Sequence, residues 1–444
     1  LKPAARMSIR FLRPVSIAAA VFSTLLLGFH PAFAQQPDTP GVQPVLHLDS
    51  LLQAADRANP SLRAARLRAE AQALKEPQAS ALPDPTVQGT GHVYPTVTAR
   101  GPQRSQWQLR QSIPFPGKRS LRGEVAALGA DAAEADAEAL ARNLALRIEA
   151  AYYELYRVQR REELLHAFEE QLRQFESAAS TRYEVGDGSQ QAILKAQVER
   201  GRLEMQRENL RAERESALQS LVRLTGRSDL EAPTQPVDVT VPSNLEEVGE
   251  RAGEEAAEDR PEAEALRRRI EQAESEMALA RRAYWPDFTV GAAYTDVRRD
   301  DLTPTMSGRD AFTLSVGVSI PLWRGKQEAR LEEATVERHR TEAELEDFRL
   351  GVQAEVRDLR ERIGRQQRQL TLLGEQLLPQ AESSLEATLS AYKAGRTDFL
   401  DLLDAERTLF QLQLKQVDTH VRALQTAAKL EYVLGQISLS GDRP

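Results

Sequence analysis

The chain repeats its own order of landmarks, and this repetition restricts the folds open to it. Asn59-Pro60 in the first half corresponds to Arg260-Pro261 in the second, and the offset between matching landmarks drifts only from 201 to 209 residues. The other matches are Leu82-Pro83-Asp84 with Trp285-Pro286-Asp287, Ile113-Pro114 with Ile320-Pro321, and Tyr183 to Gly186 with Tyr392 to Gly395. We therefore predict two structural repeats per chain, each with strands and helices that must find neighbours to pack against.

The N-terminal segment has the pattern of a secretory signal peptide. Arg10 and Arg13 precede an apolar run from Val15 to Phe29, and Ala32-Phe33-Ala34 supplies small residues for cleavage. We predict a signal peptide at residues 1–34, starting at Leu1 or Met7, and an N-terminal extension at 35–58. An uncleaved signal anchor is the alternative. No cysteine follows the apolar run, so we expect no N-terminal lipid anchor.

Alternating side chains mark the predicted strands. Phe312, Leu314, Val316, Val318 and Ile320 alternate with polar or small residues, which is the period of a β-strand. We predict strands at about 85–97 and 105–114 in the first repeat (59–226), and at about 287–297 and 311–321 in the second (260–437). Segments of about ten residues match a tilted span of a bilayer, although hairpins of a soluble sandwich show the same alternation. Four strands cannot close a barrel, so several chains would have to share one.

Two helices are predicted to be too long for a globular core. After Gly117 the helical pattern runs to Tyr183, and in the second repeat it runs from Gly325 to Tyr392, with Pro379 as the point of a bend. In the first of them the apolar positions recur every seven residues, at Leu144, Ala151, Val158, Leu165, Leu172 and Ala179. Each helix would span roughly 100 Å.

The remaining segments are predicted from turn residues and caps. Returning helices are expected at Ser189–Gly226 and Thr397–Gly435, and opening helices at Pro60 to about Leu82 and Pro261 to about Trp285. An inter-repeat linker with a short helix is expected at 227–259, and a C-terminal tail at 438–444.

The composition and the scattered polar residues argue against an enzyme. The net charge of −8, with acidic and basic residues interleaved, gives no reason to expect nucleic acid, and the absence of cysteine excludes disulfides and thiolate metal sites. Gly117-Lys118-Arg119 follows a strand but lacks the serine or threonine of a phosphate loop. His166, His339 and His420 stand alone on helices, so we predict no metal site, no cofactor and no catalytic residues.

The repeated order resembles that of the TolC family of outer membrane factors over roughly residues 45–437. Tyr392, Gly395, Asp401, Leu403 and Asp404 match a family pattern after the second glycine turn, and Ile113-Pro114-Phe115-Pro116-Gly117-Lys118 resembles the strand-to-helix junction of the heavy-metal (cobalt-zinc-cadmium and copper-silver) branch. The resemblance implies a mostly α fold with a membrane β-barrel part. It also implies a homotrimer whose twelve-stranded barrel continues into a long α-helical periplasmic tunnel, in the outer membrane of a Gram-negative bacterium.

The same resemblance assigns residues to a site. It places Asp401 and Asp404 at the periplasmic aperture, whereas the first repeat carries Ala192 and Lys195 at the matching positions. The residues expected to contact an adaptor are those of the two turns, Gly186, Asp187, Gly188, Gly395 and Arg396. An ordinary solvated helix face would also explain the aspartates.

We therefore expect a passive outer membrane conduit for heavy-metal cations, working with a periplasmic adaptor (membrane fusion protein), an inner-membrane RND-type pump and outer membrane lipid. Within the same class, the alternative is an exit duct for drugs or for type I protein secretion. From another class, the alternative is a periplasmic coiled-coil scaffold.

Overall fold

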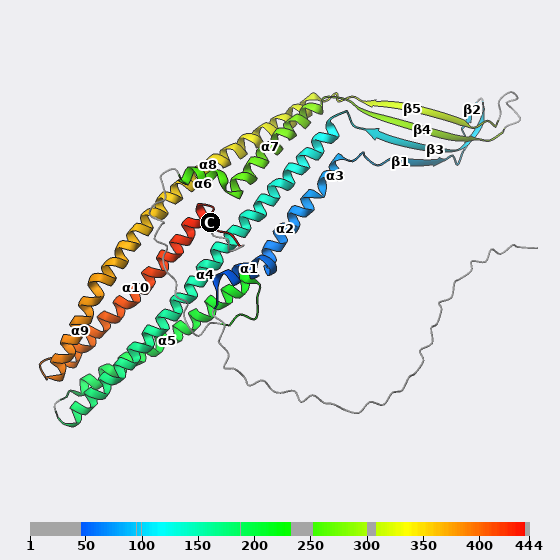
Figure 1. The fold of residues 1–444 in the computed structure, drawn as a ribbon. Helices are drawn as coiled ribbons and strands as arrows, with labels where there is room; N and C mark the ends of the chain where they lie inside the picture. The colour runs from blue at the N-terminus through cyan, green and yellow to red at the C-terminus, as the bar shows by residue number, and fades with distance from the viewer. Residues whose placement is uncertain are drawn as a thin grey trace, which may run out of the picture. The chain divides into compact units, whose positions relative to one another are not determined.

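The computed structural model describes residues 46–94, 96–98, 100–186, 188–231, 252–299 and 308–439, all within one unit, Pro44–Pro444. The predicted signal peptide, Asp187, most of the predicted linker and the end of the predicted tail lie outside the described residues. Helices make up most of the described chain, and the strands form an antiparallel sheet (Figure 1).

The first long helix is continuous. α4, Lys118–Glu184, contains 67 residues, which confirms the helix predicted from Gly117 to Tyr183. Gly117 precedes it at φ 90°, a left-handed conformation that residues with a Cβ rarely adopt. The apolar positions spaced by seven are buried along α4, except Ala151, which is half-buried. α4 packs against four other helices: α2 (Pro60–Ala73), α5 (Gln190–Thr225), α7 (Pro261–Arg282) and α10 (Phe399–Val433).

The second long helix has the predicted span but not the predicted continuity. It consists of α8 at Arg324–Leu372, a π-helical turn η2 at Leu373–Leu377 and α9 at Leu378–Lys393. Pro379 has no N–H to donate and its ring crowds the carbonyl of the preceding turn. A π-helical turn directly before the proline relieves this conflict, so the expected bend takes the form of a wider turn.

The returning helices are confirmed to within two residues at each end. α5 runs Gln190–Thr225 and α10 runs Phe399–Val433. Gly226 and Gly435 follow them at φ 72° and 76°, the left-handed conformation that commonly ends a helix.

The opening helices differ between the two repeats. α7, Pro261–Arg282, is continuous. The prediction of a single helix at 60–82 is wrong, because the chain forms α2 at Pro60–Ala73 and α3 at Lys75–Ser80. Pro77 would clash with the carbonyl of Ala73 in a continuous helix, which explains the break. Two shorter helices lie outside the repeats: α6, Ala252–Asp259, in the predicted linker, and α1, Leu48–Ala58, in the predicted extension. The sequence pattern does not predict α1.

The described strands form one antiparallel sheet in the order β1-β3-β4-β5. The strands are β1 at Thr86–Gly91, β3 at Gly101–Ile113, β4 at Asp287–Val297 and β5 at Ala311–Ser319, with a two-residue β2 at Val97–Thr98 beside β3. The strand expected at about 85–97 is therefore too long, and the one expected at 105–114 begins earlier. Gly101, at φ 116°, begins β3, and there Gly101 and Pro102 pair with Thr98 and Val97 of β2.

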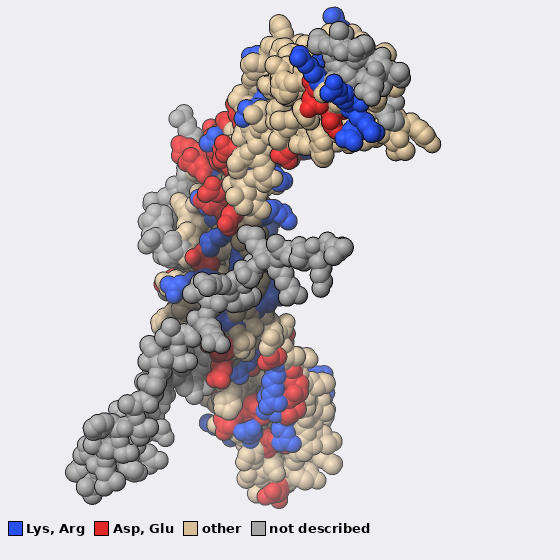
Figure 2. All heavy atoms as spheres, turned by 90° about the vertical axis from the view of Figure 1, so that its right-hand side faces the viewer, with Lys and Arg blue, Asp and Glu red and all other residues tan. Residues whose placement is uncertain are grey.

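One face of the sheet is apolar and exposed. The register pairs Tyr294 with Trp107 and with Phe312, and pairs Val290 with Val316, so these side chains share a face. Phe312 and Val316 are 70% and 76% exposed. In Figure 2 uncharged side chains cover most of the visible surface of the strands, whereas acidic and basic side chains are interleaved over the helices below. β1 and β5 each pair with only one strand among the described residues.

The helices bury two main apolar clusters. The larger one joins α1, α4, α5, α8 and α10 around Leu51, Ile148, Leu221, Ile363 and Leu430. The second lies farther from the sheet and includes Phe168 and Leu172 of α4, Leu203 of α5 and Leu402 of α10. No helix within the described residues combines the length and the apolar character needed to cross a membrane.

Candidate aperture and docking turns at the distal end

The predicted site lies where α4 turns into α5 and α9 turns into α10, at the opposite end of the helices from the sheet (Figure 1). We call this the distal end. Glycine makes both turns possible. Gly186 at φ 84° and Gly395 at φ 69° take the left-handed conformation, and each N–H donates to the carbonyl of the tyrosine three residues earlier.

The residues around these glycines are mostly open to solvent. Arg396 is exposed, and its N–H donates to the carbonyl of Ala391 at 2.9 Å. Gly188 is constrained by its surroundings, since a Cβ there would lie 2.6 Å from the backbone nitrogen of Tyr183. The predicted contact residue Asp187 lies outside the described residues.

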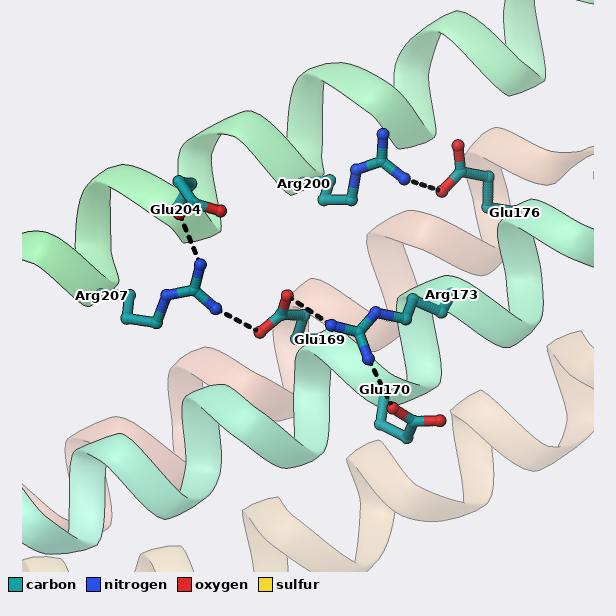
Figure 3. A network of polar contacts seen from close by, with 7 residues as sticks. All are labelled: Glu169, Glu170, Arg173, Glu176, Arg200, Glu204 and Arg207. Carbon is teal, nitrogen blue, oxygen red and sulfur yellow. Dashed lines mark hydrogen bonds and ion pairs between the residues drawn. The ribbon is translucent and has the colours of Figure 1, made fainter.

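An ion-pair ladder joins the two helices of the first hairpin (Figure 3). The rungs between α5 and α4 are Arg200 with Glu176 at 2.9 Å, Arg207 with Glu169 at 3.3 Å and Arg214 with Glu162 at 3.9 Å. Successive rungs are seven residues apart on both helices, so one antiparallel register brings all three together. The third rung is the weakest, and burial raises the pKa of Glu162 despite the nearby Arg214. Such ion pairs add little to the free energy of unfolding of the hairpin. The main effect of the ladder is therefore to fix the register of α5 against α4.

We expect reversal of one rung to be restored by reversal of its partner. Arg200→Glu should place two carboxylates together and lower the free energy of unfolding by about 1 kcal/mol, and Glu176→Arg in the same chain should recover most of that loss. Urea unfolding followed by circular dichroism measures both. Lys195→Glu is the control, because Lys195 is an exposed residue of α5 that forms no ion pair among the described residues. A double variant no more stable than Arg200→Glu alone would show that the rung does not set the register.

Asp401 and Asp404 lie on the exposed side of the first turns of α10. Both are exposed, while Leu402 and Leu403 between them are buried at 0% and 2% exposure. Asp398 caps the helix, and its Oδ1 accepts from the N–H groups of Leu400 at 2.7 Å and Asp401 at 3.1 Å. Thr397 Oγ1 donates to Asp401. Neither Asp401 nor Asp404 forms an ion pair with the described part of the chain.

The structure adds a contact between the two distal turns that the sequence does not reveal. Arg182 Nη1 donates to the carbonyl of Tyr392 at 2.8 Å, and its guanidinium lies 4.9 Å from the centre of the Tyr392 ring. Tyr183 is the counterpart of Tyr392 in the first repeat, yet Tyr183 is 47% exposed and Tyr392 only 7%. The repeated sequence shows that the two tyrosines are equivalent, but it does not show which of them Arg182 contacts.

Two more polar contacts link the repeats behind the turns. Arg407 of α10 donates to Glu199 of α5, whose side chain is 9% exposed. Arg157 of α4 bridges Glu213 of α5 at 2.7 Å and Asp418 of α10 at 3.8 Å. These pairs tie the second hairpin to the first, at positions whose spacing in the sequence is too large for any local pattern to indicate.

A buried glutamate lies close to the acidic pair. Glu406 of α10 is 7% exposed, and its Oε2 has no hydrogen-bond partner among the described residues. Burial raises the pKa of Glu406 to about 7. Sequence reasoning missed it because a glutamate among leucines on a helix usually faces water.

Comparison with known proteins agrees with this architecture. Residues 252–436 match the outer membrane efflux protein family. The chain is 23% identical to the cobalt-zinc-cadmium resistance protein CzcC of Cupriavidus metallidurans, over 97% of this chain and 98% of that protein.

Solved structures share the fold at low sequence identity. The outer membrane protein VceC from Vibrio cholerae is 22% identical with a TM-score of 0.72, covering 87% of this chain and 96% of that one. A membrane protein from Pseudomonas aeruginosa is 19% identical with a TM-score of 0.76, covering 88% and 93%. The family match, the full-length relative and the shared fold together show an outer membrane efflux protein domain at residues 252–436, in a chain with the fold of a TolC-like outer membrane factor.

Proposed function

We propose that three copies of this chain form a passive exit duct in the outer membrane of a Gram-negative bacterium. Four main strands from each copy would close a twelve-stranded barrel, and the helices would continue it as a periplasmic tunnel. The observation that carries the proposal is the sheet itself, whose apolar face is exposed and whose outer strands β1 and β5 pair on one side only among the described residues. In a bilayer such edges must be paired, and closure with other copies pairs them.

The distal end would then be the periplasmic entrance. Asp401 and Asp404 from three chains would converge around a narrow opening, where carboxylates attract cations and repel one another. The turns at Gly186 to Gly188 and at Gly395 and Arg396 are the proposed contacts for a periplasmic adaptor, which would connect the duct to an inner-membrane RND-type pump. The two repeats at 59–226 and 260–437, and export directed by a signal peptide at 1–34, belong to the same proposal.

The proposed substrate is a heavy-metal cation. Support comes from the full-length relative, whose name refers to resistance to cobalt, zinc and cadmium. The duct itself would need no metal site, because selection would be made by the pump. An exit duct for drugs or for secreted protein is the rival within the class, and a periplasmic coiled-coil scaffold is the rival outside it.

Fractionation tests the duct against the scaffold. A detergent-resistant trimer in the outer membrane fraction is the expected result, because closing the barrel removes the open strand edges. Recovery of a stable soluble monomer after cell breakage would reject the duct.

Metal tolerance tests the substrate separately. A strain that lacks this gene is expected to become more sensitive to zinc, cadmium or cobalt, and the gene carried on a plasmid should restore tolerance. Unchanged sensitivity to zinc, cadmium, cobalt, copper and silver, with the trimer still present in the membrane, would reject the metal assignment and leave the duct in place.

Single-channel recording tests the aperture. The variant Asp401→Ala with Asp404→Ala is expected to change the conductance and to reduce its dependence on divalent cations, because the carboxylates would no longer attract cations at the constriction. Glu361→Ala is the control, since Glu361 is an exposed acid on α8 far along the chain from the turn. Conductance equal to that of the unmodified protein would place the two aspartates outside the aperture.

A further inference from the structure

A groove of about 900 Å³ lies where the helices meet the sheet. Its walls come from the start of α4, the end of α7, the segment after β5 and the first turns of α8. On the sheet side it is lined by Trp285, Ile320, Leu322 and Trp323, and the two tryptophans are 54% and 83% exposed. This part of the groove offers apolar surface next to the apolar face of the sheet.

Basic and acidic side chains occupy two successive layers along the rest of the groove. The charged lining residues at the start of α8 are Lys326, Arg330, Glu333 and Glu337, at spacings of four, three and four residues that place them on one helix face. Moving away from the sheet, the groove therefore presents apolar, then basic, then acidic side chains. Arg330 and Glu333 are separated by roughly 4.5 Å along the helix axis.

The basic layer is available to a ligand. Lys326, Arg330 and Arg122 from α4 form no ion pair with the described residues. Lys118 beside them is different, because its Nζ donates to Asp287 Oδ1 and to the carbonyl of Trp285, both at 2.8 Å, and is buried. Lys118 holds the sheet to the helices and Arg122 also acts on Asp287, whereas Lys326 and Arg330 have no anionic partner among the described residues.

Two of the three carboxylates of the acidic layer, Glu276 and Glu333, form no ion pair with the described residues. Glu276 of α7 faces Glu337 and Glu333 of α8, and burial raises the pKa of Glu276, with further increases from these two carboxylates. Arg340 pairs with Glu337, but Glu333 forms no ion pair among the described residues. Carboxylates that gather in this way favour a positively charged partner.

We propose that the groove binds a glycerophospholipid with a phosphoethanolamine head group. The acyl chains would lie on Trp323 and the apolar face of the sheet, the phosphate between Lys326 and Arg330, and the primary ammonium against Glu333 and Glu276. The two-carbon ethanolamine link matches the short step between the basic and acidic layers. This proposal rests on the proposed function, because the sheet meets lipid only if it lies in a membrane.

Lipid titration of the purified, delipidated full-length trimer tests the order of the layers. Trp107→Phe leaves Trp285 and Trp323, the other two of the three tryptophans, to report binding by fluorescence. The probes are short-chain phosphatidylethanolamine and short-chain phosphatidylglycerol, which share the phosphate but differ in the ammonium. Phosphatidylethanolamine is expected to bind about tenfold more tightly.

Two variants separate the layers. Lys326→Gln with Arg330→Gln should weaken both lipids about tenfold, because the phosphate loses its cations, whereas Glu276→Gln with Glu333→Gln should weaken only phosphatidylethanolamine. The matched controls are Arg357→Gln and Glu361→Gln, exposed residues of α8 that do not line the groove. Both controls should bind as the unmodified trimer does.

A failure of the proposed lipid site can be distinguished from a failure of the proposed function. Equal affinity for the two lipids, or affinity unchanged in both groove variants, overturns the proposed site while the trimer still fractionates with the outer membrane. Free phosphoethanolamine that competes as well as the lipid would also overturn it, since the tryptophan side of the groove would then have no role. Absence of the trimer from the membrane rejects the proposed function itself, whatever the titration gives.

Discussion

Phe168→Ala is expected to lower the free energy of unfolding of the helical part by about 3–5 kcal/mol. Phe168 of α4 is 4% exposed and stacks on Phe410 of α10, which is 6% exposed, with ring centres 4.4 Å apart and planes at 13°. The stack joins the hairpin of the first repeat to that of the second. Removing one ring leaves a cavity that the long helices cannot close without losing their other contacts.

Urea unfolding of the detergent-solubilised chain, followed by circular dichroism, measures this loss. Phe410→Ala and the double variant complete a cycle, in which we expect a coupling of about 0.5–1.5 kcal/mol from the stacked rings. Tyr183→Ala, an aromatic residue of α4 that is 47% exposed, is the control and should change stability by less than about 0.5 kcal/mol. If Phe168→Ala cost no more than this control, the two hairpins would not be held together by the buried stack.

Glu406→Gln is expected to stabilise the distal end at pH 8 and to change little at pH 4. The pKa of Glu406 is raised to about 7 in the folded chain, from a usual value of 4.5, by burial. Between about pH 4.5 and pH 7 the folded chain therefore keeps a proton that the unfolded chain releases, so the free energy of unfolding falls as the pH rises through this window. Above pH 7 the loss is complete, and we expect it to be about 2 kcal/mol after allowing for solvent screening.

Glutamine has nearly the shape of a protonated glutamic acid and does not ionise. The free energy of unfolding of Glu406→Gln should therefore stay level between pH 4 and pH 8 as far as this site contributes, while that of the unmodified chain declines. Glu382→Gln provides the comparison, because Glu382 of α9 is exposed. Parallel pH profiles for Glu406→Gln and the unmodified chain would mean that Glu406 reaches water or a cation when ionised.

Local patterns predicted the long elements well because each of them repeats one simple signal many times. The apolar positions spaced by seven predict the part of α4 from Leu144 to Ala179, and glycines that take the left-handed conformation predict the ends of α5 and α10. The errors arise where a single residue competes with such a pattern. Pro77 divides the first opening helix, and a π-helical turn precedes Pro379 where a simple bend was expected.

The candidate site was predicted only in part. Asp401 and Asp404 follow from the resemblance, and the structure places both on the exposed side of α10. Arg182 and Glu406 could not be predicted in this way, because each depends on what other helices place beside it. Arg182 contacts Tyr392, which lies 210 positions away in the sequence. Glu406 is buried by helix packing, and the apolar pattern around it in the sequence does not predict that burial.

Short-range spacing in the sequence determines the order of the elements, the positions of the turns and the faces that must be covered. It can do so because a helix or a strand depends on residues only a few positions away. Which of two equivalent residues is buried is settled only when the helices pack, as Tyr392 and Tyr183 illustrate with 7% and 47% exposure. Burial and pairing are properties of neighbours in space, and in this chain many of those neighbours come from the other repeat.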